Sequence, residues 1–190
     1  MLSARTFSTK LLEVCLEDTN NFVGVYAIGE KKFIYVNQAG LTMFGMPDLN
    51  SFRQAYEGGL RKQAISHEQY EVMREVARRV GSWTEEVLYV KPGGEEFWGN
   101  LNLKLFEYDG EEFYLVKITD IAEKKRVEFR LYADEQRFQA VFKHAAMGIL
   151  VADQTGRIIM VNKFVERLFQ YTPEELMGKT IEILIPEHLR

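Results

Sequence analysis

The chain has 190 residues, 46% of them hydrophobic, which excludes general disorder and provides for one complete core and part of another. The formal net charge is −4 and the basic residues are scattered, which argues against nucleic acid as a partner. The single cysteine, Cys15, cannot form an internal disulfide, and we expect a reducing, cytoplasmic location. Every apolar run is shorter than the ~20 residues that cross a bilayer, so no membrane contact by this chain is expected.

The first elements are a helix and a hairpin. Apolar residues recur at helical spacing near the N-terminus, and residues 1–19 are predicted to form a helix. Phe22–Ile28 and Lys32–Val36 are β-rich runs separated by a glycine-containing turn, which predicts a hairpin. A helix is then expected to begin at Asn37 and to end at Gly45.

A longer helix is predicted further along the chain. The pattern is weak between Pro47 and Ile65, which predicts only short helical turns there. Ser66 and Gln69 have the spacing of a capping box, and Gly81 stands where a left-handed C-cap is expected. The helix between them carries an apolar stripe at intervals of three and four residues, formed by Tyr70, Val72, Met73, Val76, Ala77 and Val80.

Three strands follow, each bounded by turn residues. Trp83–Val90, Glu96–Phe106 and Glu112–Thr119 are separated by a Pro-Gly-Gly turn and by the tight-turn pair Asp109-Gly110, which predicts an antiparallel meander. In the middle strand apolar and polar residues alternate, so one face is expected to point to the core. The apolar positions are Phe97, Gly99, Leu101, Leu103 and Leu105.

Two strands, helices and three further strands form an α+β unit, an antiparallel sheet with helices on one face. Within this order, the segments FIYVNQAGLTMFG, ISHEQYEV, PGGEEFW and ITDIAEKKR resemble the PAS domain family. The resemblance implies a PAS fold with a five-stranded antiparallel sheet, and we assign residues 20–122 to a first PAS domain.

An internal repeat extends the resemblance. The segment Val23-Gly24-Val25 matches Met147-Gly148-Ile149, and FIYVN matches IIMVN, which ends at Asn162. We assign residues 142–190 to the N-terminal half of a second PAS domain, because the long helix and three strands of the first copy have no counterpart before Arg190. A truncated second domain is expected to leave a strand edge without hydrogen bonds.

Residues 123–141 are predicted to form a helical connector. The segment Asp120-Ile121-Ala122-Glu123 resembles the family's DIT exit motif and is also a helix-capping signal. Leu131, Phe138 and Val141 approximate a seven-residue apolar seam, which Asp134 interrupts, and this predicts a marginal coiled coil and a homodimer. We interpret a set of residues here as the signal relay, namely Asp120, Ile121, Glu123 and Leu131.

The inward positions of the first domain allow two interpretations. The residues favour ordinary core packing, and a pocket for a small apolar ligand is the alternative. The candidate pocket residues lie on predicted helices and strands and are Met43, Met73, Tyr89, Gly99, Leu101 and Ile118.

No cofactor is predicted, with FAD or haem as the alternatives. The reactive cysteine segment of light-sensing PAS relatives is absent, and the positions that match their flavin-binding amides are Tyr89, Gly99 and Ile118. Trp83 and Trp98 resemble tryptophans of flavin-binding redox sensors. Some PAS domains bind haem through a histidine on this helix, and His67 is the candidate here. It stands at the capping position, however, where haem-free PAS domains also carry histidine.

These patterns predict a sensory and dimerisation PAS module. Neighbouring acids such as Glu85 and Glu86 point to opposite faces of a strand and are expected at the surface, so neither a catalytic pair nor a metal site is predicted. The resemblance implies a sensor histidine kinase of a two-component system, or a cyclic-di-GMP enzyme, whose output domain lies outside this chain. The alternative is a redox or gas sensor with bound flavin or haem.

Overall fold

The computed structural model describes residues 19–186, which divide into two units that meet between Lys125 and Arg126. The helix predicted over residues 1–19, with Cys15, lies outside the described residues apart from Thr19.

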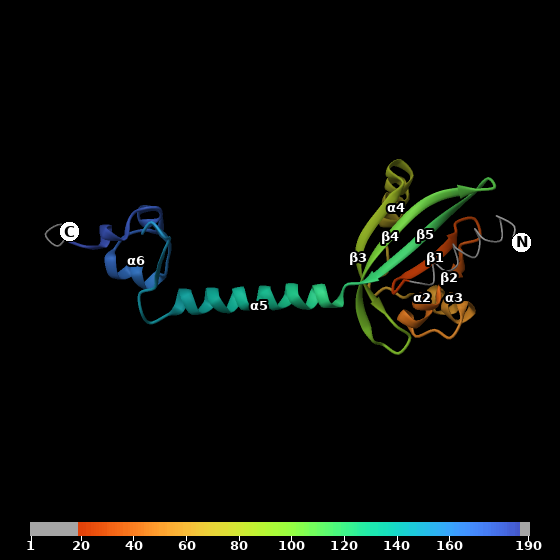
Figure 1. Cartoon of the computed structure of the whole chain (residues 1–190), viewed down its shortest axis with the longest axis horizontal. Helices are drawn as coiled ribbons and strands as arrows, with labels where there is room; N and C mark the ends of the chain where they lie inside the picture. The colour runs from red at the N-terminus through yellow and green to blue at the C-terminus, as the bar shows by residue number, and fades with distance from the viewer. Residues whose placement is uncertain (1–18, 187–190) are drawn as a thin grey trace, which may run out of the picture. The chain divides into compact units, whose positions relative to one another are not determined.

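The first unit is an α+β domain built on one antiparallel sheet with the strand order β2-β1-β5-β4-β3 (Figure 1). Its elements in chain order are β1 Phe22–Ala27, β2 Lys32–Val36, α2 Gln38–Phe44, α3 Leu49–Gly58, α4 His67–Val80, β3 Ser82–Val90, β4 Glu96–Tyr108 and β5 Glu111–Asp120. The first strand pairs with the last, so hydrogen bonds join the N-terminal hairpin to the meander. The predicted five-stranded sheet with its helices is confirmed.

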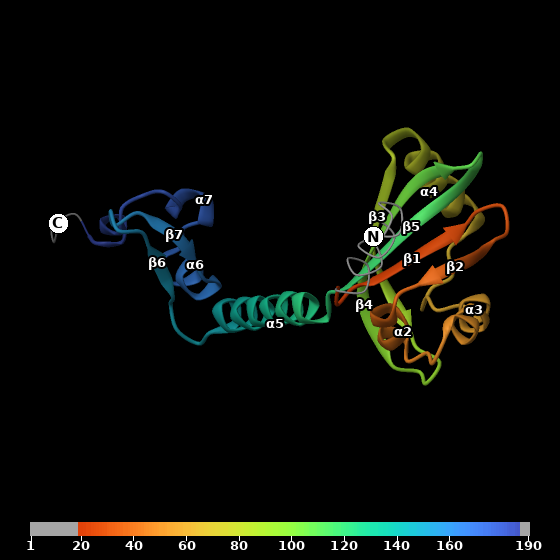
Figure 2. The ribbon, with the colours of Figure 1, turned by 45° about the vertical axis from the view of Figure 1, so that its right-hand side comes forward.

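Apolar and polar residues alternate along β4, and the apolar side chains lie on the face of the sheet that the helices cover (Figure 2). Phe97, Gly99, Leu101 and Leu103 are buried, whereas the residues between them are only partly covered. Leu101 lies opposite Ile118 of β5 in the antiparallel register. Because successive side chains point to opposite faces, this register places the inward residues of both strands in one core.

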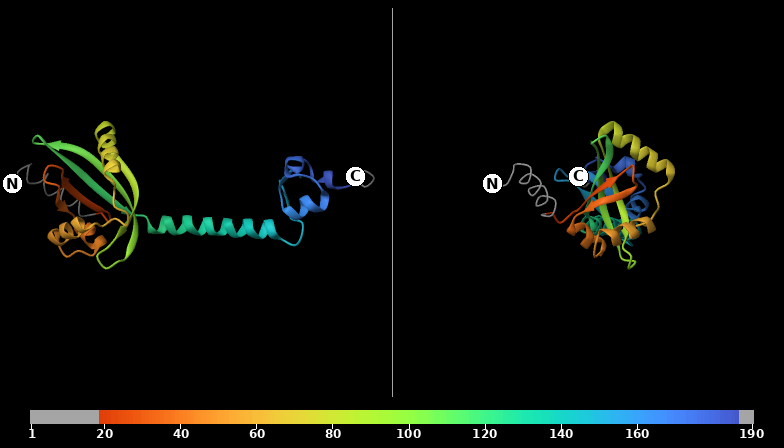
Figure 3. Two further views of the ribbon diagram at one scale, coloured as in Figure 1. Left: turned by 180° about the vertical axis from the view of Figure 1, so that it is seen from behind. Right: turned by 90° about the vertical axis from the view of Figure 1, so that its right-hand side faces the viewer.

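The helices divide the inner face of the sheet between them. In Figure 3, α4 lies toward one end of the sheet, and α2 and α3 lie toward the other. Ser66 and Gln69 form the predicted capping box of α4, and Gly81 ends the helix in the left-handed conformation. Only part of the predicted apolar stripe is buried, because Val72 and Val80 are 48% and 64% exposed.

Helix α3 corrects the prediction of short turns between Pro47 and Ile65. It is a regular helix of ten residues. At its start the Asp48 side chain accepts a hydrogen bond from the Ser51 amide at 2.8 Å. Phe52 is its buried residue and packs into the aromatic core. Leu49 and Ala55 pack against the same core, and the Tyr56 ring lies against Phe52, so the buried face of α3 recurs at helical spacing that the prediction missed.

A buried asparagine joins β1, β2 and α2. The Oδ1 atom of Asn37 accepts hydrogen bonds from the backbone amides of Val23 and Gly40, both at 2.9 Å, and its Nδ2 donates to the Asn21 carbonyl. The side chain is fully buried. It therefore satisfies a free amide of the helix start and ties the corner between β2 and α2 to the neighbouring strand.

The second unit repeats this corner. Its elements are β6 Leu150–Ala152, β7 Ile158–Val161, α6 Lys163–Phe169, α7 Pro173–Leu176 and the 3-10 helix Ile181–Leu184. Asn162 accepts from the amides of Ile149 and Val165 and donates to the Met147 carbonyl, in the same pattern as Asn37, so that Ile149 takes the place of Val23, two residues away from the sequence match. The sequence repeat is therefore a repeat of the same hydrogen-bond network.

The expectation of a strand edge without hydrogen bonds is wrong on one side of this unit. Segment 178–181 lies along β7, where the Ile158 amide donates to the Lys179 carbonyl and the Gly178 amide donates to the Ile158 carbonyl, both at 2.8 Å. A small core of Ile158, Val165 and Leu176 closes the unit. Backbone pairing by a non-strand segment gives no periodic sequence signal, so the alternating pattern did not reveal it.

Replacing Asn37 with alanine should lower the free energy of unfolding of the first unit by about 2–4 kcal/mol, because two buried amides lose their acceptor. Tryptophan fluorescence during urea unfolding of the chain measures this, since both tryptophans, Trp83 and Trp98, lie in the first unit. Asp48→Ala, which removes a cap at the protein surface, is the matched control and should cost less. Equal losses would show that Asn37 is no more than an ordinary cap.

Candidate ligand cavity

A cavity of about 480 Å³ lies between the inner face of the sheet, the helices and the segment 58–65. This volume falls within the range of small-molecule sites, roughly 300–1,000 Å³. Nine of the residues that line it are aromatic: Phe22, Tyr26, Phe33, Phe44, Phe52, Tyr56, Tyr70, Tyr89 and Tyr114. The domain therefore combines a packed core with a partly open, aromatic-lined chamber.

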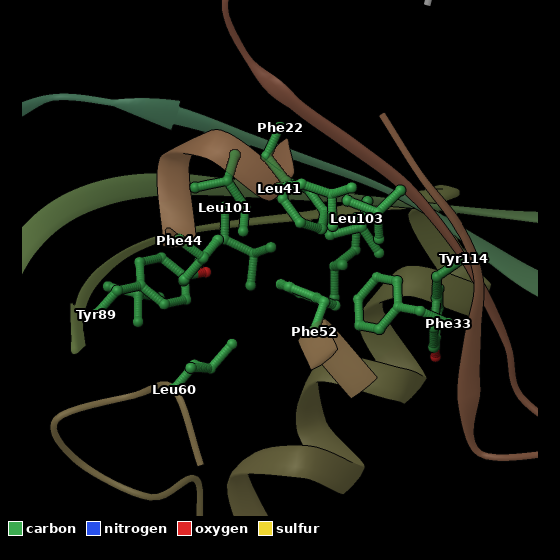
Figure 4. Packing of buried hydrophobic residues seen from close by; sticks show 14 of the residues in the cluster. Phe22, Phe33, Leu41, Phe44, Phe52, Leu60, Tyr89, Leu101, Leu103 and Tyr114 are labelled. Carbon is green, nitrogen blue, oxygen red and sulfur yellow. The ribbon is translucent and has the colours of Figure 1, made fainter. Parts of the chain in front are cut away.

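The apolar part of the chamber is a cage of phenylalanine rings (Figure 4). Phe22 meets Phe33 and Phe44 edge to face, with ring centroids 5.9 and 5.8 Å apart. Phe52 is tilted against Phe22 at 5.3 Å. Edge-to-face contact is the favoured geometry for aromatic pairs, so the rings hold one another in place around the chamber.

Tyrosine hydroxyls provide the polar groups of the chamber. The hydroxyls of Tyr26 and Tyr56 are hydrogen-bonded to each other, and burial raises the pKa of both. Burial likewise raises the pKa of Tyr89, although the nearby Arg61 guanidinium acts in the opposite direction. The buried Tyr114 hydroxyl has no hydrogen-bond partner within residues 19–186. At neutral pH these groups are therefore neutral hydroxyls able to donate hydrogen bonds.

Arg61 and Lys62 line the chamber on the segment that follows α3. This segment runs along the edge of β3, where the Lys62 amide donates to the Leu88 carbonyl and the Val90 amide to the Leu60 carbonyl, both at 2.8 Å. Arg61 is ion-paired with Glu85 of β3, with 3.2 Å between Nη1 and Oε2. These pairings fix the cationic side chains beside the chamber.

The structure separates the six candidate pocket residues into two groups. Met73, Tyr89, Leu101 and Ile118 line the chamber, whereas Met43 and Gly99 are not among the lining residues. Met43 packs against the edge of the core. A Cβ atom on Gly99 would lie 2.7 Å from Ile118 Cγ2 and 2.8 Å from Tyr89 Cε2, so the glycine makes room for neighbouring side chains.

The relay candidates lie where β5 leads into helix α5, Ala122–His144. The Asp120 carboxylate accepts a hydrogen bond from the Ala122 amide at 2.8 Å, and the Ile121 amide donates to the Trp98 carbonyl at 2.9 Å. Glu123 lies in the first turn of α5, and Leu131 is an exposed residue further along it.

A charged cluster that the sequence did not reveal holds the start of α5 against the sheet. Lys124 and Lys125 both pair with Glu86 of β3. Hydrogen bonds from the two lysines lower the pKa of the Glu86 carboxyl. Lys125 Nζ also lies 5.0 Å from the centre of the Trp98 ring on β4. We call Glu86, Trp98, Lys124 and Lys125 the exit clamp.

The residues at the candidate cofactor positions do not fit flavin or haem. Tyr89, Gly99 and Ile118 carry no side-chain amide for a flavin ring, and His67 is exposed in the first turn of α4, outside the residues that line the chamber. Within residues 19–186, no group of three metal-ligating side chains is found. Trp83 packs against the core, and Trp98 belongs to the exit clamp.

The family profiles for the PAS domain match residues 22–123 and 136–190, so the chain belongs to the PAS domain family and carries two PAS segments. Sporulation kinase E of Bacillus subtilis (strain 168) is 32% identical over 83 residues, which are 41% of this chain and 11% of that protein. The chain thus spans about a tenth of the length of this curated relative.

Two solved structures share the fold at low sequence identity. An RNA-binding light-oxygen-voltage receptor is 15% identical with a TM-score of 0.56, and the match covers 71% of this chain and 39% of that one. A PAS domain from Colwellia psychrerythraea is 12% identical with a TM-score of 0.51, covering 62% and 98%. No helix within the described residues is long and apolar enough to cross a membrane.

The raised pKa of Tyr89 predicts a loss of stability at alkaline pH. The unfolded chain releases this proton near pH 10.0, while the folded protein retains it, so the contribution of Tyr89 is present below pH 10 and is lost as pH rises toward the folded pKa. Tyr89→Phe should make the decline above pH 10 shallower by up to ~1.4 kcal/mol per pH unit. Urea unfolding at pH 9 to 11 measures it, and Tyr108→Phe at an exposed position should leave the slope unchanged. An unchanged slope in Tyr89→Phe would contradict the burial argument.

Proposed function

We propose that this chain is the sensory region of a larger signalling protein, in which the first PAS domain binds a small molecule and helix α5 carries the signal to the second PAS segment and an output domain. The similarity to Sporulation kinase E supports a sensor histidine kinase of a two-component system as the class of that protein. The chain itself acts without catalysis, and the output enzyme lies outside it.

The observation that carries the proposal is the direct link between the chamber and α5. Ile118 lines the chamber from β5, and two residues later Asp120 caps α5. Glu85 and Glu86 are successive residues of β3: Glu85 pairs with Arg61 beside the chamber, and Glu86 pairs with the lysines of the exit clamp. A ligand that displaces β3 or β5 would therefore also displace the residues that hold the start of α5.

The exit clamp suits a switch because its contacts are electrostatic and lie near the surface. Such ion pairs exchange readily with water and contribute little individually. A small displacement of β3 can then release the first turn of α5 without unfolding the sheet, whose strands are held by continuous backbone hydrogen bonds.

Replacing Glu86 with glutamine should loosen the start of α5. Both lysines lose their ion pair with Glu86, so amides in residues 122–126 should exchange hydrogen several-fold faster while β4 and β5 keep their protection. Hydrogen exchange with mass spectrometry on the chain measures this. Glu95→Gln, which removes a carboxylate paired with Lys91 in the β3–β4 turn, is the control. Unchanged exchange in residues 122–126 would remove the exit clamp from the mechanism.

We further propose that α5 supports a homodimer through its apolar seam. Leu131, Phe138 and Val141 are exposed on this helix, and Asp134 interrupts the seam while pairing with Arg137. Exposed apolar residues at seven-residue spacing favour pairing with an identical helix.

Replacing Leu131 with lysine should shift sedimentation of the chain toward the monomer, because like charges would meet across the two-fold axis. Gln136→Lys adds the same charge to the opposite side of the helix and should leave the profile unchanged. Identical profiles for Leu131→Lys and the unaltered chain over a wide concentration range would exclude this seam from the interface.

A further inference from the structure

The residues around the chamber carry charge of one sign only. Arg61 and Lys62 are cationic, and no aspartate or glutamate is among the described residues that line it. Lys62 is paired with Glu96. The Arg61 charge acts on both Tyr56 and Tyr89, so the guanidinium lies near these two hydroxyls. Glu85, the partner of Arg61, is not among the lining residues, so an anionic ligand group would meet a cation at the chamber wall, whereas a cationic group would find no carboxylate among the described lining residues.

The hydroxyl of Tyr89 adds a donor at the same place. Tyr89 is 95% buried, and its hydroxyl lies close enough to the Arg61 guanidinium to feel its charge. Figure 4 shows this hydroxyl pointing away from β3 toward the phenylalanine cage. Burial keeps it protonated, because the charged phenolate is poorly solvated there. An acceptor on a ligand in the chamber could therefore take a hydrogen bond from this hydroxyl.

Backbone pairing places the two donors beside each other. Arg61 forms an isolated antiparallel bridge with Tyr89, so their side chains lie on the same face. The Arg61 guanidinium is 22% exposed and donates to only one Glu85 oxygen. Arginine has five donors in a planar fork, which leaves donors for a second carboxylate without breaking the existing ion pair.

From this geometry we propose that the chamber binds a small aromatic carboxylate, with its ring in the phenylalanine cage and its carboxylate on Arg61 and the Tyr89 hydroxyl. The inference rests on the proposed sensory function and names the ligand class. An aromatic ring matches the cage because it can make the same edge-to-face contacts that Phe44 makes with Phe22 and Phe52. The volume of about 480 Å³ admits a single substituted ring with a short side chain.

A set of four related probes tests the class. Isothermal titration of the chain uses four probes: 3-phenylpropionate, its neutral amide, the corresponding 3-phenylpropylamine and aliphatic hexanoate. Their affinities separate the contribution of the charge from that of the aromatic ring. We expect the aromatic acid to bind on the order of tenfold more tightly than the amide, as a charge-assisted hydrogen bond contributes more than a neutral one. The amine should not bind, and hexanoate should bind more weakly than the aromatic acid because it lacks the ring.

Substitutions locate the carboxylate. Arg61→Gln should reduce the affinity for the acid to that for the amide, and Tyr89→Phe should weaken the acid severalfold. Lys91→Gln removes a cation that does not line the chamber and is the matched control. Arg61→Lys keeps the charge and should retain the preference for the acid with reduced affinity. This result would show that the loss in Arg61→Gln comes from the missing charge and not from a folding defect.

The outcomes separate the ligand class from the sensory function. Equal affinity for acid and amide, unaltered in Arg61→Gln, would overturn the carboxylate assignment and leave a sensory chamber for neutral ligands. Binding of none of the four probes would also overturn the ligand class. Neither outcome bears on the exit clamp, whose Glu86→Gln test uses no ligand.

Discussion

The architecture depends on one buried amide. Asn37 holds the start of α2 against β1, and the close approach this requires is visible at Gly40, where a Cβ atom would lie 2.6 Å from the Phe22 ring. Phe22 in turn meets Phe44 and Phe52 in the cage around the chamber. The hydrogen bonds of Asn37 therefore help to set the positions of the phenylalanine rings around the chamber. Its repetition at Asn162 shows that the same constraint builds the second PAS segment.

The sheet has two functional faces because successive strand residues point in opposite directions. On β3, Tyr89 contributes to the chamber while Glu86 belongs to the exit clamp, and on β4, Leu101 lines the chamber while Trp98 lies against Lys125. A ligand in the chamber would thus contact the face of these strands opposite to the one that the exit helix contacts. A ligand that binds more tightly to one position of the strands would therefore shift the strands toward that position and change the contacts between the sheet and α5.

Local chemistry made much of the fold predictable. The alternation in β4 and the Ser66 capping box each specify one conformation from neighbouring residues, and both were found. Helix α3 was missed although Leu49, Phe52 and Ala55 give it a buried face at helical spacing, because polar residues and glycines surround these few apolar positions in the sequence. Glu86 was expected at the surface without a role, since its partners Lys124 and Lys125 are brought to it only by the fold. Arg61 was missed for the same reason: only its bridge with β3 places it beside Tyr89.

The central claim is that occupancy of the chamber and the hold on α5 are coupled. Hydrogen exchange in residues 119–126 of the chain, with and without a saturating ligand of the chamber, tests this most directly. The account predicts that the ligand changes exchange in this segment, and that the change is much smaller in Glu86→Gln, where the exit clamp is already open. A saturated chamber with unchanged exchange in residues 119–126 of the unaltered chain would contradict it.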